Sequence, residues 1–99
     1  MSQFAKFIKF TEMLSNAEKE LGIDHLSGLD KRILYFLEKA SVAGSSMSFE
    51  ELNKVMDTPR ATLYRHVQGL VDKGLISKHK DPNDGRRNII SVTIPVRIS

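Results

Sequence analysis

The sequence predicts an α+β fold in which several helices are followed by a β-hairpin. Two patterns support this prediction. As far as Lys73, apolar residues recur every three or four positions, as in helices that bury one face. After Gly74, apolar and polar residues alternate, which is typical of half-buried strands. A chain of 99 residues predicts one domain with a modest core. Residues 1–22 would form an N-terminal helix and residues 27–99 the rest of that domain.

The first expected helix covers residues 4–21, and Gly22 suits the position just after its end. Its apolar face contains three phenylalanines within ten residues, which is more than a surface helix needs. One use for this face is dimerisation through its first turns. The other is packing against the helix's own domain. The dimerisation candidates are Phe4, Phe7, Phe10 and Leu14.

A second helix is expected from about Ser27, whose side chain would cap its N-terminus, with Asp30 three residues later. Its inward stripe would consist of Leu29, Ile33, Leu34, Leu37 and Ala40. Next, residues 47–48 could form a very short strand. Ser48 and Glu51 have the spacing of a capping box at the start of a short helix over residues 49–56. The buried face of that helix would hold Phe49, Leu52 and Met56.

The fourth helix is predicted over residues 59–73, with Thr58 as N-cap, Pro59 as the first helical residue and Gly74 just after its end. Its core-facing residues would be Leu63, Val67, Leu70 and Val71. A strand over residues 75–80, a turn over 81–87 and a strand over 88–98 complete the chain. In the last strand one face would carry Ile90, Val92, Ile94, Val96 and Ile98.

A short helix, a tight turn and a longer helix form a helix-turn-helix, and the hairpin that follows makes it a winged helix. The major groove of DNA admits one helix, so only the outward face of residues 59–73 would meet the base edges. Arginine can bond guanine, and glutamine can bond adenine. The N-terminus of the helix could bind a phosphate. The candidate DNA contacts on and before this helix are Thr58, Arg60, Ala61, Thr62, Tyr64, Arg65 and Gln68.

The predicted turn at residues 81–87 would place a guanidinium of Arg86 or Arg87 in the adjacent minor groove. Asp84 could hold Arg86 in position. Lys78, His79 and Lys80 lie on the strand before the turn and could contact phosphates. The charge distribution agrees with this arrangement. Residues 1–53 carry six basic and eight acidic residues, whereas residues 54–99 carry nine basic and four acidic residues.

Residues 52–93 resemble the winged helix-turn-helix of the MarR family. The resemblance rests on the helix-turn-helix segment LNKVMDTPRATLYRHVQGLVDKGLI and on the wing DPNDGRR with the following IISVT. It implies that Arg60, Thr62 and Arg65 contact DNA and that Asp84 and Arg86 pair at the wing tip. Members of this family usually continue into C-terminal helices that complete the dimer and an effector pocket. Because the sequence carries no such helices after the wing, a small-molecule effector is not expected.

Other functional classes find little support in the sequence. No run of about 18 apolar residues could span a membrane. The three histidines have no ligand set at metal spacing, so surface or phosphate-contact roles are expected for His25, His66 and His79. Cap and first-turn roles explain the adjacent Glu50 and Glu51 without a catalytic pair, and no signature places a catalytic nucleophile. We therefore expect neither an enzyme nor a cofactor. The absence of cysteine suits a cytoplasmic protein, associated with the nucleoid in a prokaryotic host.

The sequence thus favours a transcriptional regulator that binds double-stranded DNA sequence-specifically, as a homodimer on an inverted repeat. Two alternatives remain at this point. The chain could be a winged-helix module for protein–protein interaction, in which the N-terminal helix docks on a partner. It could also be a DNA-binding factor without sequence preference.

Overall fold

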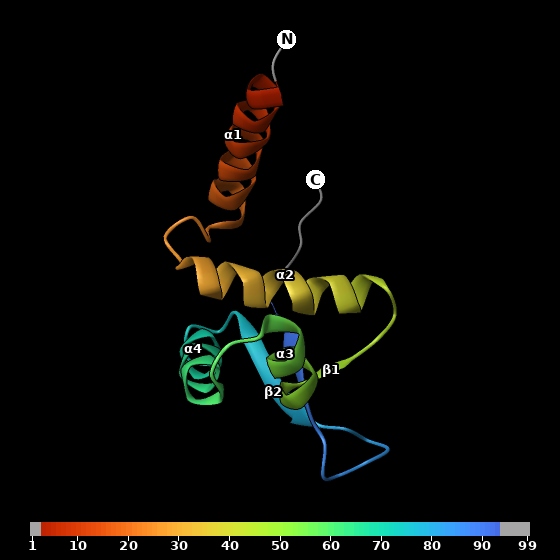
Figure 1. Ribbon diagram of the computed structural model, residues 1–99. Helices are drawn as coiled ribbons and strands as arrows, with labels where there is room; N and C mark the ends of the chain where they lie inside the picture. Colours follow the sequence, from red (N-terminus) through yellow and green to blue (C-terminus); the bar gives the residue numbers. More distant parts are fainter. Residues whose placement is uncertain (1–2, 94–99) are drawn as a thin grey trace.

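The computed structural model describes residues 3–93 and shows four helices and a small sheet (Figure 1). This is a winged helix with an added N-terminal helix, so the predicted fold class and order of elements are confirmed. The elements are α1 (Gln3–Leu21), α2 (Gly28–Val42), β1 (Met47–Ser48), α3 (Phe49–Met56), α4 (Arg60–Asp72), β2 (Ile76–Lys80) and β3 (Asn88–Val92).

The hydrophobic core lies where α2, α3, α4 and the sheet meet. Its most deeply buried side chains come from all three of these helices, as the helical periodicity predicted. Strands β2 and β3 close the core with Ile76 and Ile90. The largest fully buried side chains are Ile33, Leu52, Leu63, Val67 and Leu70.

The three strands form an antiparallel sheet in the order β1-β3-β2. Ile90 and Val92 face the core, as their alternation predicted, but Ile89 is buried as well. Its cross-strand neighbours are Ser48 on β1 and His79 on β2. Because β3 is the central strand, these neighbours flank Ile89 on both sides. β3 ends at Val92, and the predicted continuation over residues 94–98 lies outside the described residues.

The ends of the helices follow most of the predicted capping. The Ser27 side chain accepts a hydrogen bond from the backbone N–H of Asp30, and Ser48 and Glu51 form a complete capping box. Gly22 and Gly74 have the positive φ angles that follow a helix end, 72° and 76°.

The predicted start of the recognition helix is wrong by one residue. Pro59 is the N-cap of α4 instead of its first residue, and α4 has no side-chain cap at this end. The Thr58 hydroxyl donates to the carbonyl of Met56 at 3.1 Å, so it closes the turn behind α3 instead of capping α4. The left-handed conformation of Asp57, with a φ of 48°, produces this turn.

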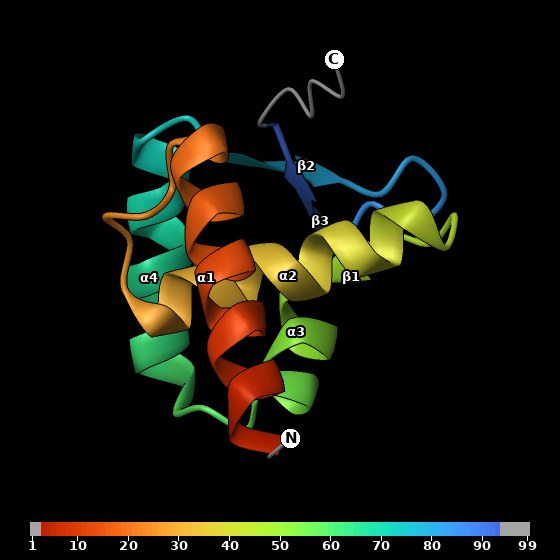
Figure 2. The ribbon, with the colours of Figure 1, turned by 90° about the horizontal axis from the view of Figure 1, so that it is seen from above.

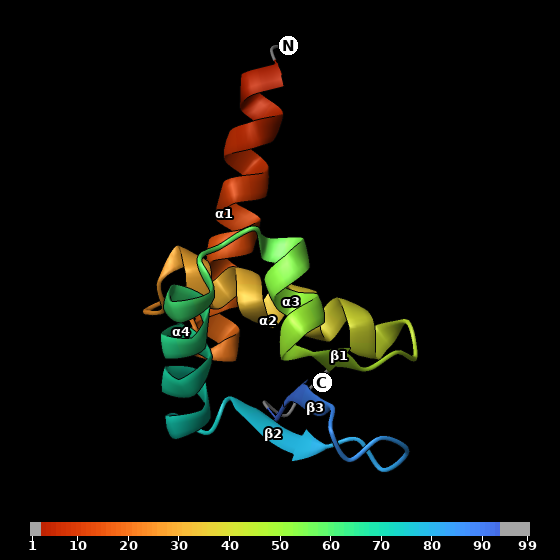
Figure 3. The same ribbon diagram turned by 60° about the horizontal axis from the view of Figure 1, so that its bottom comes forward.

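Helix α1 projects away from the winged helix (Figures 1 and 3). In Figure 2, which looks onto α2 from above, α1 passes in front of α2. None of the residues Gln3–Leu21 is buried, and Phe4, Phe7 and Phe10 are 71%, 66% and 69% exposed. The alternative that α1 packs against its own domain is therefore wrong for most of its length. Only its C-terminal end is held to α2, by an ion pair of 2.9 Å between Glu18 and Lys31.

Candidate nucleic-acid interface

Helix α4 separates its side chains into a buried and an exposed face, as predicted. Leu63, Val67 and Leu70 are buried, and Val71 packs against the core. The opposite face presents the proposed base-reading side chains to solvent. Of these, Arg60, Ala61, Tyr64 and Arg65 are exposed, and Gln68 is half-buried. This is the geometry that a recognition helix requires, because the core fixes one face and leaves the other for a groove.

Arg60, at the start of α4, is tied to the first turn of α3. Its guanidinium lies 2.6 Å from the carboxylate of Glu50 and 5.0 Å from the ring centre of Phe49. The hydrogen bond from Arg60 holds the pKa of Glu50 below its usual value. Phe49 also packs edge-on against Tyr64, with 6.1 Å between the ring centroids. Arg60 is therefore oriented by α3 while it stays exposed to solvent.

Strand β2 adds a lysine to the same surface. The Lys78 ammonium lies 5.1 Å from the ring centre of Tyr64, and it donates to the Gln68 side chain at 3.3 Å. Lys80, two residues further along β2, is exposed. These lysines extend the positive surface of α4 toward the wing.

A small polar cleft of about 200 Å³ lies beside the exposed face of α4. Arg65 and Lys73 line it together with Gly69 and a pair of side chains from two helices. That pair is His66 on α4 and the mostly buried Asp30 on α2, 2.9 Å apart. The sequence suggested a surface or phosphate-binding role for His66. The structure shows instead that His66 joins the recognition helix to α2.

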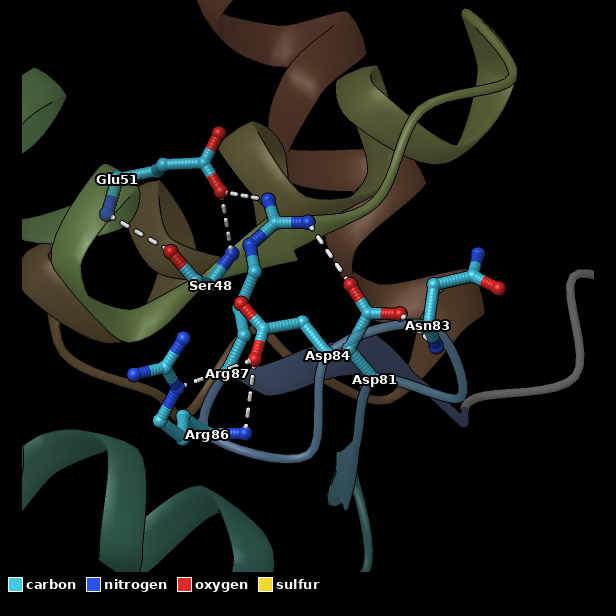
Figure 4. A network of polar contacts seen from close by, with 7 residues as sticks. All are labelled: Ser48, Glu51, Asp81, Asn83, Asp84, Arg86 and Arg87. Atoms are coloured by element: carbon cyan, nitrogen blue, oxygen red, sulfur yellow. Dashed lines mark hydrogen bonds and ion pairs between the residues drawn. The ribbon is translucent and has the colours of Figure 1, made fainter.

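The wing tip is organised by hydrogen bonds that its own carboxylates accept (Figure 4). Asp81 accepts from the backbone N–H of Asn83 at 2.8 Å, which fixes the start of the turn. Asp84 accepts from the backbone N–H of Arg86 at 3.1 Å, and the Arg86 Nε lies 3.7 Å from the same carboxylate. The predicted pairing of Asp84 with Arg86 is thus present. The Arg86 side chain is 97% exposed and available to a ligand.

Arg87 is placed very differently from its neighbour. Its guanidinium donates to Asp81 in the wing at 3.2 Å and also forms an ion pair with Glu51 of α3 (Figure 4). The hydrogen bond from Arg87 is the main reason that the pKa of Glu51 is lowered. The pKa of Asp81 is lowered first by the backbone N–H of Asn83 and then by Arg87. The sequence grouped Arg87 with the DNA contacts, but the structure engages its side chain within the protein.

The two threonines of the predicted site lie at the edge of this surface. Thr62 is half-buried in the first turn of α4, and Thr58 is half-buried just before the helix. The Thr58 carbonyl accepts a hydrogen bond of 2.7 Å from the Asn53 side chain, so the turn between α3 and α4 is fixed from both ends.

Three residues of this surface were missed because their partners are distant in the sequence. Phe49 was expected only in the core, and Glu50 and Glu51 only at the N-terminus of α3. The capping role of Glu51 is confirmed. The arginines that these residues also contact follow 10 to 36 positions later. The adjacent acidic pair at the start of α3 was the only available signal.

Within residues 3–93 the structure shows no cluster of three or more histidine, aspartate or glutamate side chains that could hold a metal ion. Over the same residues, no helix has both the length and the apolar character needed to cross a membrane.

Comparison with known proteins places this architecture in a family. The model of the MarR family matches residues 26–87, which is more than half of the 99 residues. The chain belongs to the MarR family. The resemblance noted from the recognition helix and the wing is therefore confirmed. Members of this family are transcriptional regulators, so this chain shares the family's general class of function. No curated protein sequence matches the chain.

Solved structures of MarR-family proteins share the fold at low sequence identity. The S. aureus MepR–DNA complex is 22% identical, with a TM-score of 0.67 over 93% of this chain and 72% of MepR. A mutant MarR from E. coli complexed with operator DNA is 19% identical, with a TM-score of 0.61 over 94% of this chain and 69% of that one. The adhesin competence repressor AdcR from Streptococcus pyogenes is 16% identical, with a TM-score of 0.61 over 94% of this chain and 64% of AdcR. The chain thus spans roughly two thirds of these MarR-family structures.

Proposed function

We propose that this MarR-family chain is a non-enzymatic regulator that binds double-stranded DNA sequence-specifically as a homodimer. One observation carries the proposal. Two exposed arginines, Arg65 on α4 and Arg86 at the wing tip, lie on separate elements joined by one rigid core. Both elements lie on the side of α2 opposite to α1 (Figure 1). A duplex has two adjacent grooves, and this arrangement offers one basic element to each.

In the proposed complex α4 lies in the major groove. Arg60 and Arg65 are suited to guanine and Gln68 to adenine, while Ala61 could contact a thymine methyl. The Lys78 ammonium lies over the Tyr64 ring, and Lys78 and Lys80 are suited to contacts with phosphates. Thr58 and Thr62 lie at the N-terminal end of α4, where a helix favours a phosphate.

The wing tip would lie in the neighbouring minor groove, with Arg86 as its reading side chain. Asp84 holds the Arg86 backbone and approaches its guanidinium, so the side chain starts from a restricted orientation. A narrow A·T-rich minor groove is strongly negative and attracts an inserted arginine. The wing would therefore add preference for the base composition beside the sequence that α4 reads.

Dimerisation would occur through α1, whose apolar side chains have no cover within the described chain. They include Phe4, Phe7, Phe10 and Leu14, all exposed. Next to them, α1 and α2 line an open apolar groove of about 660 Å³. Most of the stability of a helix in a protein comes from packing of its apolar face, so a second copy would stabilise α1 (19 residues) by burying this face. A two-fold dimer would then read two half-sites of an inverted repeat.

Two of the solved structures with the same fold support the proposal by what they contain. The MepR structure holds DNA, and the E. coli MarR mutant holds operator DNA. This chain has the same fold and belongs to the same family as these proteins.

To test the proposal, duplexes that bind the purified chain are selected from a random library at physiological salt, with excess nonspecific competitor. We expect an enriched inverted repeat with half-sites about one helical turn apart. Enrichment of a single half-site would contradict the dimer. Binding that disappears under competitor would contradict sequence-specific recognition and favour an interaction module that uses α1.

On the selected duplex, Arg65→Ala should weaken binding by about 1–3 kcal/mol, because it removes a base-reading guanidinium. Lys9→Ala is the matched control. It also removes one positive charge, but from the exposed side of α1 opposite to the phenylalanines, away from both the apolar groove and the proposed DNA surface. Equal affinities of the two variants would exclude Arg65 from the interface.

A further inference from the structure

Consecutive arginines in the wing have opposite environments. Arg86 extends into solvent with its side chain 97% exposed, whereas the side chain of Arg87 is 34% exposed and bonded to two carboxylates. Figure 4 shows these side chains diverging, with Arg87 directed at Glu51 and Asp81. A guanidinium that bridges two carboxylates gains strong charge-assisted hydrogen bonds. Arg87 would have to give up these bonds in order to reach a phosphate.

The two carboxylates belong to different parts of the molecule. Asp81 begins the wing and also accepts from the backbone N–H of Asn83, so it is part of the turn itself. Glu51 lies in the first turn of α3, and its Oε1 also accepts from the backbone N–H of Ser48. Ser48 is buried and pairs with β3. Arg87 therefore joins the hairpin loop of the wing to the N-terminus of α3, which is fixed to the core.

We propose that Arg87 is a positioning residue that fastens the wing to the capping box of α3. It would thereby hold Arg86 where this side chain can enter the minor groove while α4 lies in the major groove. The inference rests on the proposed DNA binding and assigns Arg87 a role other than the direct contact expected from the sequence. Helix α3 carries Glu50, which orients Arg60 by a similar ion pair. The N-terminus of α3 would thus set the positions of a recognition-helix arginine and of the wing together.

Substitutions of the carboxylates distinguish this role from a direct contact. Glu51→Gln retains a side-chain oxygen for the capping box, and Asp81→Asn retains one for the Asn83 N–H, but each removes a charge that Arg87 requires. If Arg87 positions the wing, each change should weaken binding to the selected duplex about fivefold. If Arg87 contacts phosphate, removal of a negative charge nearby should leave binding equal or tighter.

A second arm measures the coupling of the two arginines. Arg86→Ala and Arg87→Ala should each weaken binding about tenfold relative to the wild type. The double variant should also lose only about tenfold, because Arg86 contributes little once the wing is released. Two independent DNA contacts would give about a hundredfold loss. Arg87→Lys retains the charge but lacks the planar fork, so we expect it to remain impaired. Near wild-type binding by this variant would indicate a phosphate contact.

Thermal unfolding of every variant establishes that it is folded, and Lys9→Ala controls for the loss of one positive charge. Tighter binding by Glu51→Gln, or multiplying effects of the two arginine changes, overturns the positioning role while the proposed DNA binding stands. A wild-type chain that selects no duplex overturns both.

Discussion

The two ends of this molecule differ in whether their apolar side chains are buried. At the winged-helix end, α2, α3, α4 and the sheet bury Leu52, Leu63 and Val67 completely. At the other end, α1 has an apolar face with three phenylalanines and no buried residue. Apolar periodicity is similar in both regions, so periodicity alone does not decide what covers a helix. The winged helix buries its apolar residues within one chain, whereas those of α1 are exposed in the described part of the chain.

The largest effect should come from creating a cavity in the core of the winged helix. Leu63→Ala removes a fully buried side chain of α4 and should lower the free energy of unfolding by about 2–5 kcal/mol. Chemical denaturation of dilute protein measures the change. Leu14→Ala is the matched control, because Leu14 is 61% exposed on α1. A similar loss in both variants would show that α1 is part of the same folding unit and would remove the contrast.

The second largest effect should come from charges on the apolar face of α1, which should disrupt the proposed dimer. Phe7→Glu combined with Phe10→Glu should raise the dissociation constant at least about a hundredfold, because unpaired carboxylates would be buried at the interface. Sedimentation equilibrium measures the association, and far-UV circular dichroism shows whether the winged helix remains folded. Lys9→Glu controls for charge, since residue 9 lies on the opposite side of the helix. Unchanged association in the double variant would move the interface away from α1.

Much of this fold could be predicted from the sequence because its signals are local. The capping residues Ser27 and Ser48 and the glycines after α1 and α4 act within a few positions, and all were found in their predicted roles. The inward and outward faces of α4 follow from a period of 3.6 residues. The start of α4 was misplaced because Thr58 had a second acceptor, the carbonyl of Met56, which a local capping rule does not consider.

The candidate site was less predictable, because its side chains are oriented by partners far along the chain. The sequence identified basic residues but could not distinguish the exposed Arg86 from Arg87, which is bonded to Glu51 of α3. It likewise gave no reason to connect Asp30 with His66, 36 positions apart. Such pairs depend on how helices cross, which periodicity does not specify. Local patterns therefore predicted which residues face outward, but not which of them remain available to a ligand.

A smaller effect is expected at the contact that ties the recognition helix to α2. Asp30→Ala should lower the free energy of unfolding by about 1–2 kcal/mol, because it leaves the His66 ring without its partner beside the core. Urea denaturation of Asp30→Ala, His66→Ala and the double variant measures the coupling between the two side chains. Additive losses would mean that the 2.9 Å contact contributes nothing specific.

The smallest predicted effect concerns acid, and it should appear at the winged-helix end. The pKa values of Glu51 and Asp81 are lowered, chiefly by hydrogen bonds from Arg87 and from the Asn83 backbone respectively. A carboxyl group whose folded pKa is below its unfolded value stabilises the fold above the unfolded value, near pH 4. That stabilisation is lost as the pH falls through the folded pKa. Unfolding free energies at pH 7 and pH 3 should therefore differ less in Arg87→Ala than in the wild type.

Lys9→Ala is the control for this comparison, because it removes a positive charge from α1, on the opposite side of α2 from the wing, and should keep the wild-type pH dependence (Figure 1). An Arg87→Ala chain with the full wild-type dependence would show that Asp81 owes its lowered pKa to the Asn83 backbone and Glu51 to its capping-box bonds with Ser48. In that case the ion pair between Arg87 and Glu51 would contribute little in solution, and the wing would be tied to the core only through the sheet. A reduced dependence would instead show that the two carboxylates keep their bonds to Arg87 in solution, as wing positioning from α3 requires.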